Sequence, residues 1–276
     1  LGPSYARVSA VFIWSYIKRL FSARDASASA EHLGHVGGGY RQIFACIKSA
    51  VEQGGGRIET GRAVSQVRAL DDGGLEVMVD SQPRRFDKVV CTSPVSVLQQ
   101  IVDPRLLRID AEDRGVEYLG VVCVVLITES ALAPYYVVNI ADDEIPFTGL
   151  IGMSNVISPD HTAGHHVTYL PKYMLSTDDE LRQSDHYFKE RFLAGLTRMF
   201  PDFDHDKIVS IHVNRAIKVQ PLQVIDYSRL VPSVETRHQD LFVLNTSQFV
   251  NATLNNNEVI GAVNRFHEGH ARDLAA

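Results

Sequence analysis

The sequence predicts an α+β fold in which mixed sheets are flanked by helices. Helical and strand patterns both occur, without the strict alternation of a doubly wound parallel fold. Hydrophobic residues make up 45% of the 276 positions and charged residues 22%, which is ordinary for a globular protein with a core. The longest apolar runs, such as residues 121–127, have the length of a strand and fall far short of the ~20 residues of a membrane-spanning helix.

The helices are predicted from apolar residues at helical spacing and from the residues that end them. The first spans residues 8–21, and a loop of small and polar residues follows at 23–30. In the second, residues 40–53, four apolar side chains make one stripe, and three glycines then end the helix. The others span residues 94–101, 178–200 and 256–274, and an asparagine among residues 255–257 should cap the last one.

The strands are predicted from period-two alternation and from β-branched runs between turn residues. Residues 75–79 alternate clearly, and residues 117–128 are typical of a central strand. We expect one mixed sheet from residues 117–128, 135–140, 149–153, 167–170 and 208–216, covered by helix 178–200 through Phe188, Phe192 and Leu196. The other strands are predicted at residues 57–60, 63–67, 86–92 and 241–244.

Charge and cysteine content argue against several classes of function. The formal net charge of −6 disfavours a nucleic-acid partner, because phosphate binding needs a basic surface. The 3 cysteines lie far apart in the sequence, as in proteins with reduced thiols, and the chain does not open on a signal-peptide pattern, so we expect a cytoplasmic protein. His161, His165 and His166 share a loop without the spacing of convergent ligands, so no metal site is expected.

A block in the first third of the chain resembles a known family. The order is a glycine loop from Gly34 to Gly39, a helix, the glycines before Ile58, a valine strand, a hairpin, and then the segment Asp87 to Pro94. This order is similar to that of the flavin-dependent amine oxidase superfamily, which includes protoporphyrinogen-oxidase-like and phytoene-desaturase-like proteins and the related UDP-galactopyranose mutases. The resemblance implies a substrate-binding domain together with part of an FAD-binding domain.

The resemblance also implies which residues lie near FAD. Val64 matches the position whose backbone meets the adenine, and the segment Thr92, Ser93 and Pro94 matches one that lies beside the cofactor. At the C-terminal strand, relatives usually carry Ala-Gly followed by an acidic residue, and this chain has Leu244, Asn245 and Thr246 instead. Asn245, Thr246 or Gln248 would then have to substitute for the acidic residue. The start of the last helix, at Asn256 and Asn257, would cover the flavin, because a helix N-terminus favours negative charge.

One motif of these relatives is missing from the sequence. No G-x-G-x-x-G, the motif that holds a dinucleotide pyrophosphate, occurs in the chain. We therefore expect the C-terminal portion of a longer flavoprotein, with FAD in the full-length protein and an inactive fragment that lacks it. Residues 1–100 would supply a helical segment and part of the FAD-binding domain, residues 101–235 the substrate-binding domain, and residues 236–276 a return to the FAD-binding domain.

The function implied by the resemblance is FAD-dependent oxidation, with a hydride passing from a C–H bond of a small molecule to the flavin. Tyr136, Tyr169 and Arg215 are the candidate substrate-binding residues, and no catalytic residue is assigned. Two alternatives stay open: a UDP-galactopyranose-mutase-like enzyme acting on a sugar nucleotide, and a binding domain without catalysis. The substrate, the electron acceptor and the oligomeric state are left open by the sequence.

Overall fold

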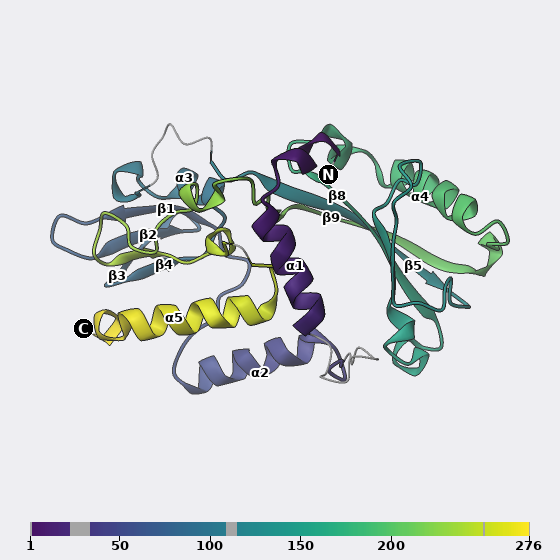
Figure 1. Ribbon diagram of the computed structural model, residues 1–276. Coiled ribbons are helices and arrows are strands. Elements are labelled where there is room, and N and C mark those ends of the chain that lie inside the picture. The colour runs from purple at the N-terminus through teal and green to yellow at the C-terminus, as the bar shows by residue number, and fades with distance from the viewer. Residues whose placement is uncertain (1, 23–33, 109–114, 251, 276) are drawn as a thin grey trace. The chain divides into compact units, whose positions relative to one another are not determined.

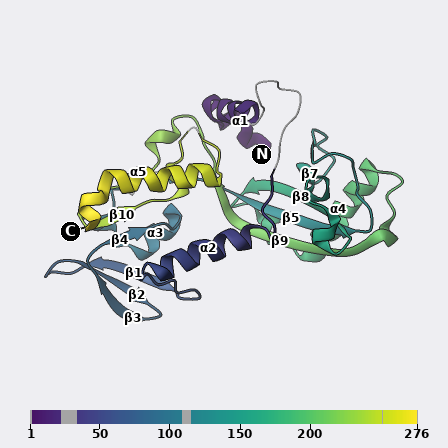
Figure 2. The same cartoon turned by 90° about the horizontal axis from the view of Figure 1, so that it is seen from below.

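The fold is described from a computed structural model, which defines residues 2–22, 34–108, 115–250 and 252–275. Its contacts divide the chain into two compact units, whose elements can be followed in Figures 1 and 2. The first unit comprises residues 1–2, 24–58 and 118–219, and the second comprises residues 3–23, 59–117 and 220–276. The predicted boundaries after residues 100 and 235 stay predictions, and the loop predicted at 23–30 lies mostly outside the described residues.

The first unit is built on a five-stranded sheet with the order β6-β7-β8-β5-β9. Its strands are β5 (Tyr118–Thr128), β6 (Val137–Asn139), β7 (Gly149–Gly152), β8 (His166–Leu175) and β9 (Ile208–Pro221). These are the strands that the sequence assigns to one sheet, and β8 and β9 are longer than predicted.

The strands of this sheet run antiparallel, where we expected both orientations. β5 pairs antiparallel with β8 over their whole length, and β7 pairs antiparallel with β6 and β8. Backbone hydrogen bonds join Leu222 N to Glu117 O at one end of β5 and Glu129 N to Lys207 O at the other, so β9 is antiparallel as well. For β6, β7 and β8, which follow one another along the chain, short connections favour this orientation, because parallel neighbours need long crossovers.

One face of the sheet carries α4 (Asp185–Met199). As predicted, Phe188, Phe192 and Leu196 are fully buried there, in a cluster with Val124 of β5 and Leu170 of β8. The predicted helix 178–200 is wrong in one respect, because a short 3-10 helix (Asp179–Arg182) precedes α4 as a separate turn. Ser184 has extended backbone, and its side chain accepts a hydrogen bond from Tyr187 N. Both are typical of a capping residue, so α4 begins directly after Ser184.

The helix α2 (Tyr40–Gln53) also belongs to the first unit, and its bounds are those predicted. None of its residues is buried in the structure. Gly54 donates its backbone N–H to Ala50 O, and Gly55 follows with a φ of 84°, a left-handed conformation that glycine adopts without strain.

The second unit contains a three-stranded antiparallel sheet in the order β1-β2-β3. Its strands are β1 (Val64–Ala69), β2 (Leu75–Val79) and β3 (Gln82–Phe86). β2 and β3 are joined by Asp80 and Ser81, both with positive φ, as a tight hairpin requires. The strand predicted at residues 57–60 is wrong: these residues have no backbone partner in the sheet, and the Glu59 side chain bonds Arg84 instead.

A second, parallel pair of strands lies in the same unit, formed by β4 (Val89–Cys91) and β10 (Leu241–Val243). The strand predicted at 86–92 is shorter than expected, because Phe86 ends β3 and a bend at Asp87 separates it from β4. The helix α3 (Val95–Ile101) follows and packs on β1. The core of the unit combines Val67, Leu75, Val77, Val79, Cys91, Leu98, Val102, Leu107, Leu241 and Val243.

Two further helices complete the second unit, α1 (Ala10–Ser22) and α5 (Asn256–Ala275). The entry to α1 is fixed by an isolated bridge between Val8 and Val224. α5 lies along β10, where the ring of Phe266 meets that of Phe242 at 5.5 Å between centroids (Figures 1 and 2). In the described part of the chain, no helix is both long enough and apolar enough to cross a membrane.

Candidate functional site

The site residues predicted in the second unit gather at the carboxyl ends of β4 and β10. Because these strands are parallel, both end at the same edge of the sheet, the edge where nucleotide sites form in such folds. Leu244 N donates to Cys91 O at 3.0 Å beyond the last strand pair. One step further, Asn245 Nδ2 donates to Ser93 O at 2.9 Å. Two predicted residues that are far apart in sequence are thus in direct contact.

The Asn245 side chain is committed to the protein itself. Its Oδ1 accepts from Ser247 N at 2.9 Å and from Ser247 Oγ at 2.5 Å. Its own backbone N–H donates to Gln248 Oε1, which completes a capping box on the 3-10 helix Thr246–Gln248. The residue is only 7% exposed. Asn245 therefore braces the loop after β10 through both ends of its amide.

Other predicted residues lie around this edge with different exposure. Thr92 is exposed and Ser93 half-buried, while Pro94 takes the position before the first residue of α3 and accepts backbone bonds from Val97 and Leu98. Val64 begins β1 and is 41% exposed. Thr92 and Val64, both in the second unit, are thus accessible to solvent.

The start of α5 is as the sequence predicts. Asn255 Oδ1 accepts from Glu258 N at 3.1 Å, and Asn255 Nδ2 donates to Thr253 O at 2.8 Å. This cap leaves the backbone N–H groups of Asn256 and Asn257 in the first turn, where no intrahelical acceptor exists. Both side chains are exposed. The helix start therefore presents hydrogen-bond donors and a partial positive charge.

A hollow of about 460 Å³ opens beside this helix start. It is lined by Ser15, Lys18, Arg19, Ala252, Thr253, Asn255, Asn257 and Glu258. Arg19 Nη1 lies 3.4 Å from Thr253 Oγ1, which holds the guanidinium at the rim. Two cationic side chains face one carboxylate, so the hollow suits an anionic group. The sequence analysis missed Lys18 and Arg19, because nothing in the chain's order shows that α1 lies beside the start of α5.

The candidate substrate residues lie on different faces of the five-stranded sheet. Tyr169 is directly opposite Val125 of β5 and Ile151 of β7, on the face away from α4. This face is apolar and only half-buried, and Cys123 lies on it. Burial raises the pKa of the Cys123 thiol, so the thiol stays protonated at neutral pH and is a poor nucleophile.

Arg215 belongs to the other face of the sheet. Its guanidinium lies 5.3 Å from the ring centre of Phe188 in α4, and it donates to Asp185 Oδ1 at 2.5 Å and to Gln183 O at 2.7 Å. These contacts occupy the group that we expected to hold an anionic substrate. Tyr136 precedes β6 and its carbonyl accepts from Gly152 N, so its backbone fixes the strand edge.

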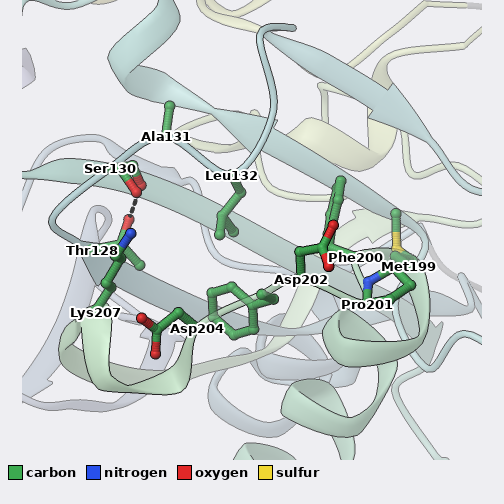
Figure 3. A pocket seen from close by; sticks show the side chains of 11 residues that line it. Thr128, Ser130, Ala131, Leu132, Met199, Phe200, Pro201, Asp202, Asp204 and Lys207 are labelled. Carbon is green, nitrogen blue, oxygen red and sulfur yellow. Dashed lines mark hydrogen bonds between the residues drawn. The ribbon is translucent and has the colours of Figure 1, made fainter.

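A further hollow of about 330 Å³ lies at the end of α4 in the first unit (Figure 3). Leu132, Met199 and Phe200 supply apolar walls, and Thr128 Oγ1 donates to Ser130 O at 2.7 Å beside it. Asp204 caps the short 3-10 helix His205–Lys207. The hollow contains no paired acid and base, and among the described residues no cluster of His, Cys, Asp or Glu could hold a metal ion.

Comparison with known proteins agrees with this arrangement. The family described as "Flavin containing amine oxidoreductase" matches residues 9–216, which include β1 to β4 and most of the five-stranded sheet. The chain belongs to this family. The resemblance predicted from the glycine loop and the valine strand is therefore confirmed, as is the α+β fold class. No curated protein sequence matches the chain.

Solved structures with a similar fold include the following three proteins. A protein described as a protoporphyrinogen oxidase from Exiguobacterium sp. 255-15 is 13% identical with a TM-score of 0.70, covering 97% of this chain and 58% of the other. Putrescine oxidase with bound putrescine is 15% identical with a TM-score of 0.61, covering 87% and 53%. Reduced UDP-galactopyranose mutase is 15% identical with a TM-score of 0.59, covering 81% and 51%. The chain spans little more than half the length of these proteins.

Members of the amine oxidoreductase family are flavoproteins that bind FAD. Part of the chain fits that cofactor: the open donors at the start of α5 and the cationic hollow beside it suit a group that becomes negative on reduction. The direct role predicted for Asn245 stays a prediction: its Nδ2 donates one of its two hydrogens to Ser93 O, and its Oδ1 accepts from Ser247. No glycine-rich pyrophosphate loop is present in the sequence.

Proposed function

We propose that the chain is the substrate-binding and flavin-covering portion of an FAD-dependent oxidoreductase that removes a hydride from a C–H bond of a small molecule. The observation that supports this most is the meeting of Ser93 and Asn245 at the common end of β4 and β10. A family match over residues 9–216 agrees with it. When bound, the flavin would supply the electron acceptor, and the chain would supply binding, orientation and charge.

The chain's own residues have three tasks in this proposal. The N–H groups of Asn256 and Asn257 donate hydrogen bonds toward the cofactor ring and favour its anionic reduced form. Lys18 and Arg19 add positive charge beside them. The braced loop around Asn245 holds the start of the loop that leads to α5 in a fixed conformation.

The substrate would contact the half-buried face of the five-stranded sheet that carries Tyr169 and Val125. An apolar surface with a tyrosine excludes water and holds a carbon skeleton, as ligand sites generally do. No general acid or base is needed for hydride removal by a flavin, so the lack of an assigned catalytic residue does not oppose the proposal.

The test is anaerobic reduction, at saturating FAD, of the longer protein of which this chain is proposed to be a portion. Amines and other small C–H donors are added in turn, and bleaching of the flavin absorbance is followed. Bleaching by one of them supports the oxidoreductase. Conversion of UDP-galactopyranose by the chemically reduced protein, without net oxidation, would support a mutase instead. Absence of any spectral change when FAD is titrated into the protein would favour a binding domain without cofactor.

A further inference from the structure

A second hollow, of about 660 Å³, lies in the second unit at the amino ends of β4 and β10, the edge opposite to Ser93 and Asn245. Lys88 directly precedes β4 and Asp240 directly precedes β10, and Val89 N donates to Asp240 O at 2.9 Å between them. The hollow is lined by Lys88, Arg108, Glu235, Thr236, Arg237, His238, Gln239, Asp240, Phe242, Gly269 and His270.

We propose that this hollow binds a phosphate group, through the guanidinium groups of Arg108 and Arg237 and the imidazole of His238. The site is separate from the proposed flavin edge and does not depend on flavin binding. The chain as a whole carries a formal charge of −6, so a concentration of basic side chains in one hollow is a local feature that its composition does not explain.

The charges in the hollow are balanced except for the two arginines. Lys88 Nζ lies 3.9 Å from Asp240 Oδ1, and His270 Nε2 lies 3.3 Å from Glu235 Oε1. Each carboxylate therefore has a cationic or donating neighbour. Among the residues that the structure describes, neither Arg108 nor Arg237 has an ion-pair or side-chain hydrogen-bond partner. Two uncompensated guanidiniums match the double charge of a phosphate, which they bind in bidentate geometry.

His238 supplies a neutral donor to the same hollow. Its Nδ1 lies 3.2 Å from Asp240 N and accepts that N–H, although it is also 3.9 Å from Asp240 Oδ2. The contact with Asp240 N is the shorter of the two, so we assign Nδ1 as the acceptor. A nitrogen that accepts a hydrogen bond carries no proton, so the ring proton is on Nε2. The Nε2–H group is then left to donate to a ligand oxygen.

The loops that carry these groups are braced before any ligand binds. Arg237 N donates to Leu106 O at 2.8 Å, which ties the segment of Arg237 to the segment that ends in Arg108. Thr236 Oγ1 accepts from His238 N and donates to His238 O, so the turn around Arg237 is closed on itself. Backbone that is already fixed lowers the entropy cost of binding.

The experiment measures binding by isothermal titration calorimetry of the 276-residue chain with inorganic phosphate, glucose 6-phosphate and acetate. We expect saturable binding of phosphate that weakens as salt is added. Arg108→Gln and Arg237→Gln should each weaken it roughly ten- to hundredfold, the effect of losing one hydrogen bond to a charged group. Arg105→Gln is the matched control, because Arg105 lies on the same segment, outside this hollow and paired with Asp103, and should leave binding unchanged.

The outcomes separate the sources of the phosphate group. Tighter binding of glucose 6-phosphate than of inorganic phosphate would support a phosphorylated small molecule as the ligand, and equal or tighter binding of inorganic phosphate would support the free ion. Equal binding of acetate, absence of saturation, or unchanged binding in both arginine variants would overturn the proposal. Thermal unfolding of each variant, expected to match that of the parent chain, verifies that the substitutions act on the hollow and not on the fold.

Discussion

At the scale of single residues, Asn245 shows how one side chain braces the loop after β10. Ser93 presents a carbonyl oxygen to the side chain at this position, and Ser247 presents two donors to it. An amide has one donor and one acceptor end and satisfies both partners. A carboxylate has only acceptors, so an acidic residue placed at this position would put an oxygen against Ser93 O.

We therefore predict that Asn245→Asp destabilises the protein by about 1–3 kcal/mol, the cost of a buried acceptor left facing another acceptor. Urea unfolding at neutral pH measures the difference. The loss should shrink as the pH falls, because protonation of the new carboxyl restores a donor for Ser93 O. Asn214→Asp, at an exposed position of β9, is the control and should change stability little. Equal stability of the Asn245 variant and the parent chain would contradict the bracing role.

A second prediction at this scale concerns the start of α5. Asn257→Asp places a carboxylate beside the hollow of Lys18 and Arg19, where the reduced flavin would be negative. In the full-length protein, we expect weaker FAD retention and a more negative flavin potential, measured by equilibrium dialysis and by redox titration. Asn264→Asp, at an exposed position further along α5, should change neither. An unchanged potential in the Asn257 variant would place the flavin elsewhere.

At the scale of elements, the contact of α4 with the five-stranded sheet holds the first unit together. Phe192 is fully buried among Phe147, Phe188 and the strands. Phe192→Ala should reduce the free energy of unfolding by about 3–5 kcal/mol, through lost burial and the cavity left behind. Phe44→Ala on α2 is the control: it removes the same side-chain atoms, but Phe44 is 66% exposed, so the free energy of unfolding should change little. Similar losses in both variants, by urea unfolding, would argue against this core.

The ion pair of Arg7 with Glu117, both in the second unit, makes part of the stability depend on pH. Arg7 forms two hydrogen bonds to Glu117, at 2.6 and 3.0 Å, which lower the pKa of the Glu117 carboxyl. Because the pKa of Glu117 is lowered in the folded state, its carboxylate stabilises the protein at pH values above the unfolded pKa of about 4.3. This stabilisation is lost as the pH falls from there through the lowered, folded-state pKa.

Arg7→Gln should therefore lower the stability only slightly at pH 7, because both side chains are largely exposed and water screens their interaction. The difference from the parent chain should disappear in strongly acidic solution. Thermal unfolding at several pH values measures it, with Arg57→Gln as an exposed control without an ion-pair partner among the described residues. A difference that stays constant with pH would exclude the ion pair as its cause.

Most element types follow from local patterns, and the errors have local causes. The stripe of α2 and its glycine end give its bounds, and the alternation of β2 gives that strand. The break at Ser184 was missed because the apolar stripe continues across it, although Ser184 is a good capping residue. Residues 57–60 have a strand-like pattern but no backbone partner, and the partner of a strand is decided by the fold and not by its own sequence.

At the scale of the whole molecule, the candidate sites depend on contacts between distant segments. The pair Ser93 and Asn245 follows from the parallel arrangement of β4 and β10, which the family resemblance anticipates. Arg108 with Arg237, and Arg19 with Thr253, had no such signal, because none of these residues belongs to a recognisable motif. Core residues can be predicted well from the sequence, because buried apolar residues recur at the spacing of a helix or a strand. The charged residues that line a hollow have no such regular spacing.

The last prediction follows from which parts of a flavin site the chain contains. The start of α5 and the edge at Ser93 offer contacts to a flavin ring, and Val64 offers backbone to an adenine. No G-x-G-x-x-G is present to hold the pyrophosphate between them, where relatives place a helix N-terminus. We therefore expect the 276-residue chain to bind FAD weakly and to lose it during gel filtration. Absorbance of the eluted protein measures retained flavin, and a stoichiometric yield would show that this chain holds the cofactor without that motif.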